Sequence, residues 1–291
     1  MAARVGRWRL FVMLGPAVMV LGVLFVGGLA LGLLRSLNYM PLIGLTEPNL
    51  DAYVAIFTDR GFLASFALSF HIAFSSTLLS AVLAVGAALV LRETGPGRRV
   101  AMFLFQMNLT IPHVVGAIGI LYLFSQSGFF ARLAHGAGLI ARTNDFPALV
   151  YDPNAIGIIL LYVWKEVPFI GVVVLAQLQG ASRDYEAIAQ TLGAGPWQRF
   201  RHVTLPVILP GLMAASVMVF AFTFGAFEIP FLLGQSHPAA LPVLAWRSYT
   251  DVDLAAKPAA MAMAMVIACM SAVMILAYLR LTRILGRRDL R

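Results

Sequence analysis

Six long apolar stretches constrain the fold of this chain more than any other feature. A helix needs about 20 apolar residues to cross a bilayer, and stretches of that length occur at 10–34, 62–91, 100–124, 155–178, 207–233 and 259–279. Only 12% of the residues are charged, against about 25% in a typical soluble domain. Backbone groups in lipid must find partners within their own segment, which favours helices. The sequence predicts an all-α polytopic membrane protein with six transmembrane helices, forming a single domain over 1–291.

The placement of positive charge predicts how these spans are oriented. Fourteen Lys and Arg residues fall at the termini and in the loops after the second and fourth spans, whereas six fall in the alternate loops. The positive-inside rule therefore places both termini in the cytoplasm, together with the loop 182–206. The fourteen are Arg4, Arg7, Arg9, Arg92, Arg98, Arg99, Arg183, Arg199, Arg201, Arg280, Arg283, Arg287, Arg288 and Arg291. This asymmetry explains the net charge of +8 by membrane orientation, and we expect no nucleic-acid partner.

Several polar residues interrupt the spans. Ionisable side chains within a membrane usually face a cavity or a partner helix, so they are candidates for a solute path. The alternatives are a polar group bonded to a neighbouring helix for His113, a structural buried ion pair for Lys165 and Glu166, and an interfacial carboxylate in water for Glu228. Prolines occur nearby, at Pro112 in the third span and Pro168 in the fourth. The candidate path residues are Asn108, His113, Lys165, Glu166 and Glu228.

The chain lacks the common catalytic and nucleotide-binding motifs. It has no Gly-x-x-x-x-Gly-Lys-Ser/Thr loop for ATP phosphates and no His-Glu-x-x-His metal site. Its five histidines are scattered, and its single cysteine excludes an internal disulfide. We therefore expect no catalytic residue, no metal and no cofactor, and an enzyme is the weaker functional class.

The loop 182–206 is polar although apolar spans flank it. Asp184 and Glu186 fall in the first turn of a predicted short helix, where the helix dipole favours anions. Gly193 is suited to end that helix in the left-handed conformation, and Pro196 to begin a second one. Two helices with a break between them would form a rigid projection for a soluble partner, whereas an ordinary amphipathic loop is the alternative.

The spacing of residues in this loop resembles the EAA loop of type I ABC importer permeases. Two positions depart mildly from the family pattern, with Ile188 in place of Ala and Val203 in place of Ile. In that family the loop is the coupling helix, which docks on a cytoplasmic ATPase. The matching positions, which the resemblance implies for ATPase coupling, are Glu186, Ala187, Gly193, Ala194, Phe200, Leu205 and Pro206.

The resemblance also implies partners, location and solute. It implies a non-catalytic subunit of the bacterial inner membrane that works with an ABC ATPase dimer, a second permease and an extracytoplasmic solute-binding protein. The second permease is either a paralogue, which we favour, or a second copy of this chain. The segments 224–234 and 241–250 are similar to those of spermidine/putrescine permeases, which implies polyamines or related cationic amines as solutes. Opines, quaternary amines, sugars or ferric iron are the alternatives within transport. A stand-alone channel or a membrane enzyme is the alternative outside it, and neither should co-purify with an ATPase.

The predicted orientation can be tested by cysteine labelling in intact cells. With Cys269 removed, a cysteine at Gln198 should be protected from impermeant thiol reagents, because the loop 182–206 faces the cytoplasm. Cysteines at Ser127 or Pro238 should be labelled. Labelling at Gln198 in sealed cells would reverse the orientation and remove the argument for ATPase coupling.

Overall fold

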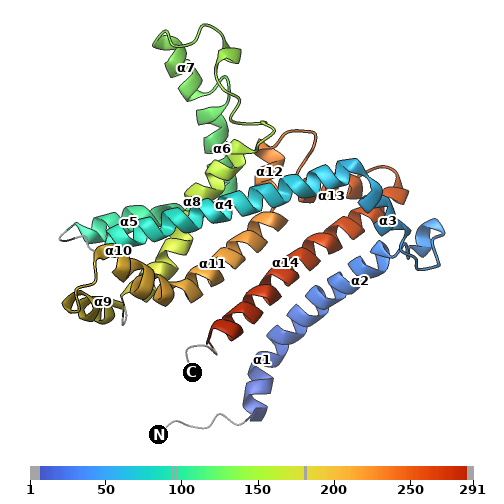
Figure 1. Cartoon of the computed structure of the whole chain (residues 1–291). Helices are drawn as coiled ribbons and strands as arrows, with labels where there is room; N and C mark the ends of the chain where they lie inside the picture. The colour runs from blue at the N-terminus through green and yellow to red at the C-terminus, as the bar shows by residue number, and fades with distance from the viewer. Residues whose placement is uncertain (1–6, 93–94, 96, 180–181, 287–291) are drawn as a thin grey trace. The chain divides into compact units, whose positions relative to one another are not determined.

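The computed structural model describes residues 7–92, 95, 97–179 and 182–286, and its elements in that part of the chain are helices (Figure 1). Arg4, Arg287, Arg288 and Arg291 of the charge count lie outside the described residues.

The longer helices are α1 (Arg7–Leu21), α2 (Gly27–Ser36), α4 (Arg60–Arg92), α5 (Arg98–Met107), α6 (His113–Phe124), α8 (Ile156–Leu178), α9 (Ser182–Thr191), α11 (Leu205–Gly225) and α14 (Lys257–Gly286). The shorter ones are α3 (Asp51–Thr58), α7 (Phe129–Gly136), α10 (Pro196–Arg199), α12 (Glu228–Leu233) and α13 (Leu241–Tyr249). Single π or 3₁₀ turns occur at η1 (Gly22–Val26), η2 (Pro41–Ile43), η3 (Asn108–Thr110), η4 (Thr143–Asp145), η5 (Phe200–Thr204) and η6 (Leu254–Ala256).

Six helical segments within the described residues are long and apolar enough to cross a membrane, which confirms the predicted all-α class with six spans. They are Val12–Ser36, Arg60–Arg92, His113–Gly136, Ile156–Leu178, Pro196–Gly225 and Leu254–Arg280. The third differs most from its predicted range, 100–124, because the chain breaks at Pro112. Ile111, which precedes this proline, is extended (φ −78°, ψ 125°), as expected for a residue before proline.

The fifth predicted span, 207–233, is also divided. The helix α11 ends at Gly225, Ala226 is extended (φ −73°, ψ 132°), and the short helix α12 begins at Glu228. Glu228 therefore lies in the first turn of a separate helix, where its negative charge complements the helix dipole.

Contacts between residues divide the chain into two compact units. One combines the chain up to Leu63 with Leu244–Val266, and the other combines Ala64–Val243 with the chain from Ile267 onward. Within the first unit, the hydroxyls of Ser36 and Tyr53 are hydrogen-bonded at 2.8 Å and join α2 to α3. Most apolar side chains on α1 and α2 are exposed in this single chain. That surface is therefore available to lipid or to another protein.

In the second unit, α8 is the central helix and packs against α11, α6 and α5 (Figure 1). Leu161 and Tyr162 on α8 are fully buried in one apolar cluster with side chains of α6 and α12. Ile170 and Val174, also fully buried, belong to a second cluster with α4 and α11. Gly171 allows the close approach of α5, since a Cβ at this position would lie 2.6 Å from the ring of Phe105.

Candidate functional site

The loop after α8 folds into two helices with a break between them, as the sequence predicted. The helix α9 ends at Thr191, α10 begins at Pro196, and α10 continues through η5 into α11. The second helix of the loop is therefore the beginning of the fifth span. Any force on α9 and α10 acts directly on a membrane-crossing helix.

Gly193 ends α9 in the left-handed conformation, with φ at +85°. The N–H of Ala194 donates to the carbonyl of Ala189 at 3.0 Å, and the N–H of Gly193 donates to that of Gln190 at 3.0 Å. This pair of bonds is the Schellman motif. A Cβ at Gly193 would meet no atom within 4 Å, so the requirement for glycine here comes from the backbone conformation and not from lack of space.

Side-chain bonds fix the second helix against the first. The N–H of Gly195 donates to Oε1 of Gln198 at 2.9 Å, which caps the start of α10. Nη1 of Arg199 donates to Oε1 of Gln190 at 2.9 Å and so connects α10 to α9. Together with the turn at Gly193, these bonds give α9 and α10 one defined geometry.

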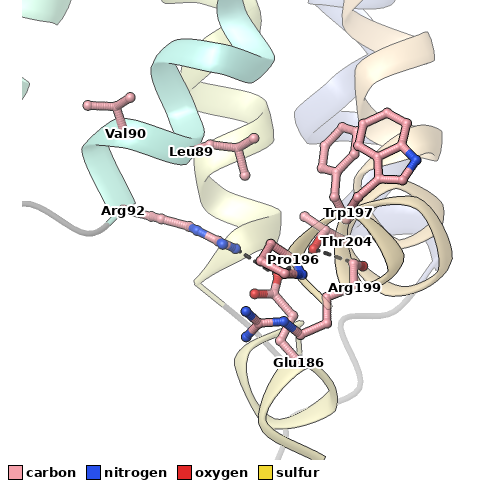
Figure 2. Close-up of a pocket in the computed structure, with 9 residues that line it drawn as sticks. Leu89, Val90, Arg92, Glu186, Pro196, Trp197, Arg199 and Thr204 are labelled. Carbon is pink, nitrogen blue, oxygen red and sulfur yellow. Dashed lines mark hydrogen bonds and ion pairs between the residues drawn. The ribbon is translucent and has the colours of Figure 1, made fainter. Parts of the chain in front are cut away.

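Glu186 makes its polar contacts with other residues of the same chain. Its Oε1 accepts from Nη1 of Arg92 at 2.7 Å and from the hydroxyl of Thr204 at 2.5 Å (Figure 2). The side chains of Arg92 and Glu186 are only 15% and 14% exposed, so solvent screens the pair less than a surface ion pair. Arg92 is the last residue of α4 and Thr204 ends η5. One carboxylate therefore links α9 to the ends of two spans.

A pocket of about 690 Å³ adjoins this ion pair. Figure 2 shows Arg92 reaching from the end of α4 toward Glu186, with Trp197 of α10 at the upper right of the view. The rings of Trp197 and Phe200 stack with centroids 5.5 Å apart. The residues around the pocket are Leu89, Val90, Arg92, Glu186, Pro196, Trp197, Arg199, Phe200 and Thr204.

The helix α9 and Leu192, the residue directly after it, form an exposed apolar surface, which we call the apolar face of α9. Tyr185, Ile188 and Leu192 are 55%, 57% and 82% exposed, and their spacing of three and four residues is that of one helix side. Glu186 and Gln190 make the bonds to Arg92 and Arg199 instead. An exposed apolar helix face on a rigid support is typical of a docking surface for another protein.

The residues predicted for coupling have different positions in this loop. Gly193 and Ala194 form the turn, Ala187 is exposed, and Leu205 and Pro206 begin α11. Reasoning from sequence did not identify Arg92 or Thr204 as partners of Glu186, nor the apolar face of α9. The face has a detectable signal in its helical spacing, whereas no sequence pattern pairs Arg92 with a residue 94 positions away.

Of the predicted path residues, the structure brings some together. Nε2 of His113 lies 3.5 Å from Oε1 of Glu166. His113 and Glu228 both line a pocket of about 400 Å³ with Phe222 and Phe227. Asn108 and Lys165 are buried and bond to main-chain atoms of the facing helices. Across the described ranges, no group of three or more His, Cys, Asp or Glu side chains is arranged to hold a metal ion.

Comparison with known proteins decides the family. Residues 77–289 match the model of the binding-protein-dependent transport system inner membrane component. The chain belongs to this permease family. It is the permease subunit of an ABC importer, a transport protein of the inner membrane, and the predicted resemblance to type I ABC importer permeases is confirmed.

Relatives and solved structures agree with this assignment. The permease is 29% identical over 243 residues to the molybdenum transport system permease protein ModB of Mycobacterium tuberculosis, covering 81% of this chain and 86% of ModB. It is 27% identical over 228 residues to the thiamine permease protein ThiP of Escherichia coli, covering 77% of this chain and 41% of ThiP. A bacterial alginate ABC transporter in complex with a pentasaccharide-bound periplasmic protein has the same fold, with a TM-score of 0.79 at 20% identity, covering 96% of this chain and 95% of that one.

The turn at Gly193 gives a direct test of the loop geometry. Gly193→Val should lower transport and transport-linked ATPase activity while the subunit remains in the membrane. A non-glycine residue costs about 1–2 kcal/mol in the left-handed conformation, and a β-branched residue is strained further. The measurement is solute uptake by the assembled transporter.

Gly195→Thr is the matched control, because Thr is similar in size to Val and Gly195 has an extended backbone (φ −68°, ψ 166°). Thr is also accepted at the start of a helix. Equal loss of transport in both variants, or full activity of Gly193→Val, would contradict the role of this turn.

Proposed function

We propose that this permease couples ATP hydrolysis by a cytoplasmic ABC ATPase dimer to solute transport, with α9 and α10 as the coupling element. The observation that carries the proposal is the exposed apolar face of Tyr185, Ile188 and Leu192 on a helix fixed by the Gly193 turn and the Arg92–Glu186 pair. In this proposal both termini and this loop face the cytoplasm, which agrees with the distribution of positive charge.

The proposed mechanism follows from how the loop is attached. Because α10 continues through η5 into α11, a displacement of α9 moves the start of the fifth span. Glu186 transmits the same displacement to the end of α4 through Arg92. We propose that docking and closure of the ATPase dimer shift these two spans together and so change which side of the membrane the path opens to.

The proposed assembly contains two further proteins. A second permease, which we propose to be a paralogue, would complete the path, and an extracytoplasmic solute-binding protein would deliver the solute. The alginate transporter, which was solved in complex with a periplasmic protein, supports the latter. The exposed apolar surface of α1 and α2 is compatible with a neighbouring membrane subunit.

ATPase binding to the face on α9 can be measured directly. Leu192→Asp should lower the amount of ATPase that co-purifies with the permease by at least about tenfold. The substitution removes a contact worth about 1.5–3 kcal/mol when buried and puts a charge in its place.

Leu42→Asp is the control, since Leu42 is 95% exposed and lies in η2, on the side of the membrane predicted to be opposite to the ATPase. It should leave co-purification unchanged. Normal ATPase recovery with Leu192→Asp would contradict the proposed docking face, and absence of any ATPase from the wild-type complex would contradict the function itself.

For the solute, we propose a polyamine or related cationic amine. The proposal is supported by the similarity of segments 224–234 and 241–250 to spermidine/putrescine permeases, and by the carboxylates of Glu166 and Glu228. Glu166 is buried beside His113, and Glu228 lines the pocket that His113 shares. The second candidate is an oxyanion such as molybdate, which the 29% identity to ModB over 81% of this chain favours.

Uptake by the complete transporter separates the two candidates. The wild type should take up spermidine and not molybdate, and Glu166→Gln should lower spermidine uptake by at least about tenfold with assembly unchanged. An uncompensated charge near the membrane centre costs at least about 2.5–3.5 kcal/mol, and the carboxylate would remove that cost for a passing cation.

Glu47→Gln is the matched control, because Glu47 is exposed and lies outside the spans. It should transport normally. Uptake of molybdate alone would reject the amine proposal in favour of the oxyanion, and spermidine uptake unaffected by Glu166→Gln would remove this residue from the path.

A further inference from the structure

A proline in α8 leaves one carbonyl group without its usual donor. Proline has no N–H, so the carbonyl four residues before it in a helix loses its helical hydrogen bond. For Pro168 that carbonyl belongs to Trp164, whereas the carbonyl of Asn108, four residues before Pro112, accepts from the N–H of Ile111 at 3.1 Å. The Trp164 carbonyl faces the buried side chain of Asn108, and in such a setting a carbonyl without a donor costs about 1–3 kcal/mol.

Each of these carbonyls receives a donor from the opposite helix. Nζ of Lys165, on α8, donates to the carbonyl of Asn108 at 2.6 Å and to that of Ile111 at 2.6 Å. In return, Nδ2 of Asn108 donates to the carbonyl of Trp164. Asn108 therefore replaces the donor that Pro168 removes, and Lys165 bonds in the opposite direction, so the two segments hold each other reciprocally. We call Asn108, Pro112, Trp164, Lys165 and Pro168 the proline interlock.

The burial and the bonding of Lys165 and Asn108 fit a structural role. Lys165 is 3% exposed and Asn108 is 7% exposed, so neither side chain is replaceable by water without rearrangement. The ammonium group lies at the carbonyl end of η3, where the helix dipole favours a positive charge. A buried ammonium group is tolerated only with well-placed acceptors, and two carbonyls at 2.6 Å supply them.

The interlock also sets the position of two candidate path residues. His113 directly follows Pro112 and begins α6, and Glu166 directly follows Lys165 on α8. The 3.5 Å separation between Nε2 of His113 and Oε1 of Glu166 thus depends on how the break in the third span is held against α8.

We propose that Asn108 and Lys165 are positioning residues that act through the backbone, and that they do not contact the solute. They fix the break at Pro112 against α8, and by this they place His113 and Glu166 along the path. The inference rests on the proposed transport function, but it assigns these two polar residues a different role from that of Glu166.

The test replaces the side-chain donor and then restores a backbone donor. Asn108→Leu removes the amide that serves Trp164, and should lower both uptake and the stability of the purified complex. A loss of about 5- to 150-fold in the ratio of folded to unfolded protein corresponds to the 1–3 kcal/mol of an unpaired carbonyl. Pro168→Ala supplies an N–H to that same carbonyl, so the double variant Asn108→Leu/Pro168→Ala should regain most of the uptake and the stability. Pro168→Ala alone should remain close to the wild type.

Lys165→Met combined with Pro168→Ala is the matched control. Lys165 serves the carbonyls of Asn108 and Ile111, which the new N–H at position 168 cannot reach, so this pair should show no rescue. If Asn108 instead contacted the solute, a backbone N–H would not rescue Asn108→Leu either, because the substituted side chain would still lack the polar group.

The outcomes separate the inference from the proposed function. Rescue of Asn108→Leu but not of Lys165→Met by Pro168→Ala supports the interlock. The inference is overturned if Asn108→Leu has no effect, if Pro168→Ala rescues neither variant, or if it rescues both equally. Failure of the proposed function would show differently, as a wild-type complex that neither retains an ATPase nor takes up solute.

Discussion

Every carbonyl and N–H group within a membrane needs a hydrogen-bond partner, and this requirement governs the interior of this permease. Helices meet that need locally, and Pro168 interrupts it within α8. Asn108 supplies a side-chain donor to the carbonyl of Trp164, and Lys165 donates in return to the carbonyl of Asn108. Because a donor without an acceptor would be equally costly, the two helices are held in one relative position. The break in the third span is therefore a defined joint.

In the proposed mechanism the loop between α8 and α11 meets a different requirement, which is to transmit force. A projecting helix can do this only if it does not bend independently of the spans. The Schellman turn at Gly193 and the bond between Arg199 and Gln190 remove that freedom within the loop. Glu186 removes it between the loop and α4, through Arg92. These contacts leave the apolar face of α9 exposed on an otherwise fixed support.

Family and solute are specified by different parts of the molecule. The match over residues 77–289 covers most of the spans and the loop 182–206. Relatives with comparable similarity are named for solutes as different as molybdenum and thiamine. We propose that a few polar side chains, such as His113, Glu166 and Glu228, distinguish the solute without changing the fold. Overall similarity therefore determines the transport class and leaves the solute open.

The sequence by itself determined the features that depend on local chemistry. The lengths of the apolar stretches predict six spans. Pro112 predicts a break because proline restricts the backbone, and Gly193 predicts a turn because glycine readily adopts positive φ. Only the tertiary structure decided the partners. Glu186 binds Arg92 across 94 positions, and Lys165 binds Asn108 across 57. Such pairs depend on the rotation and depth of each helix against its neighbours. These are set by the packing of many apolar side chains together, and no spacing along the chain records them.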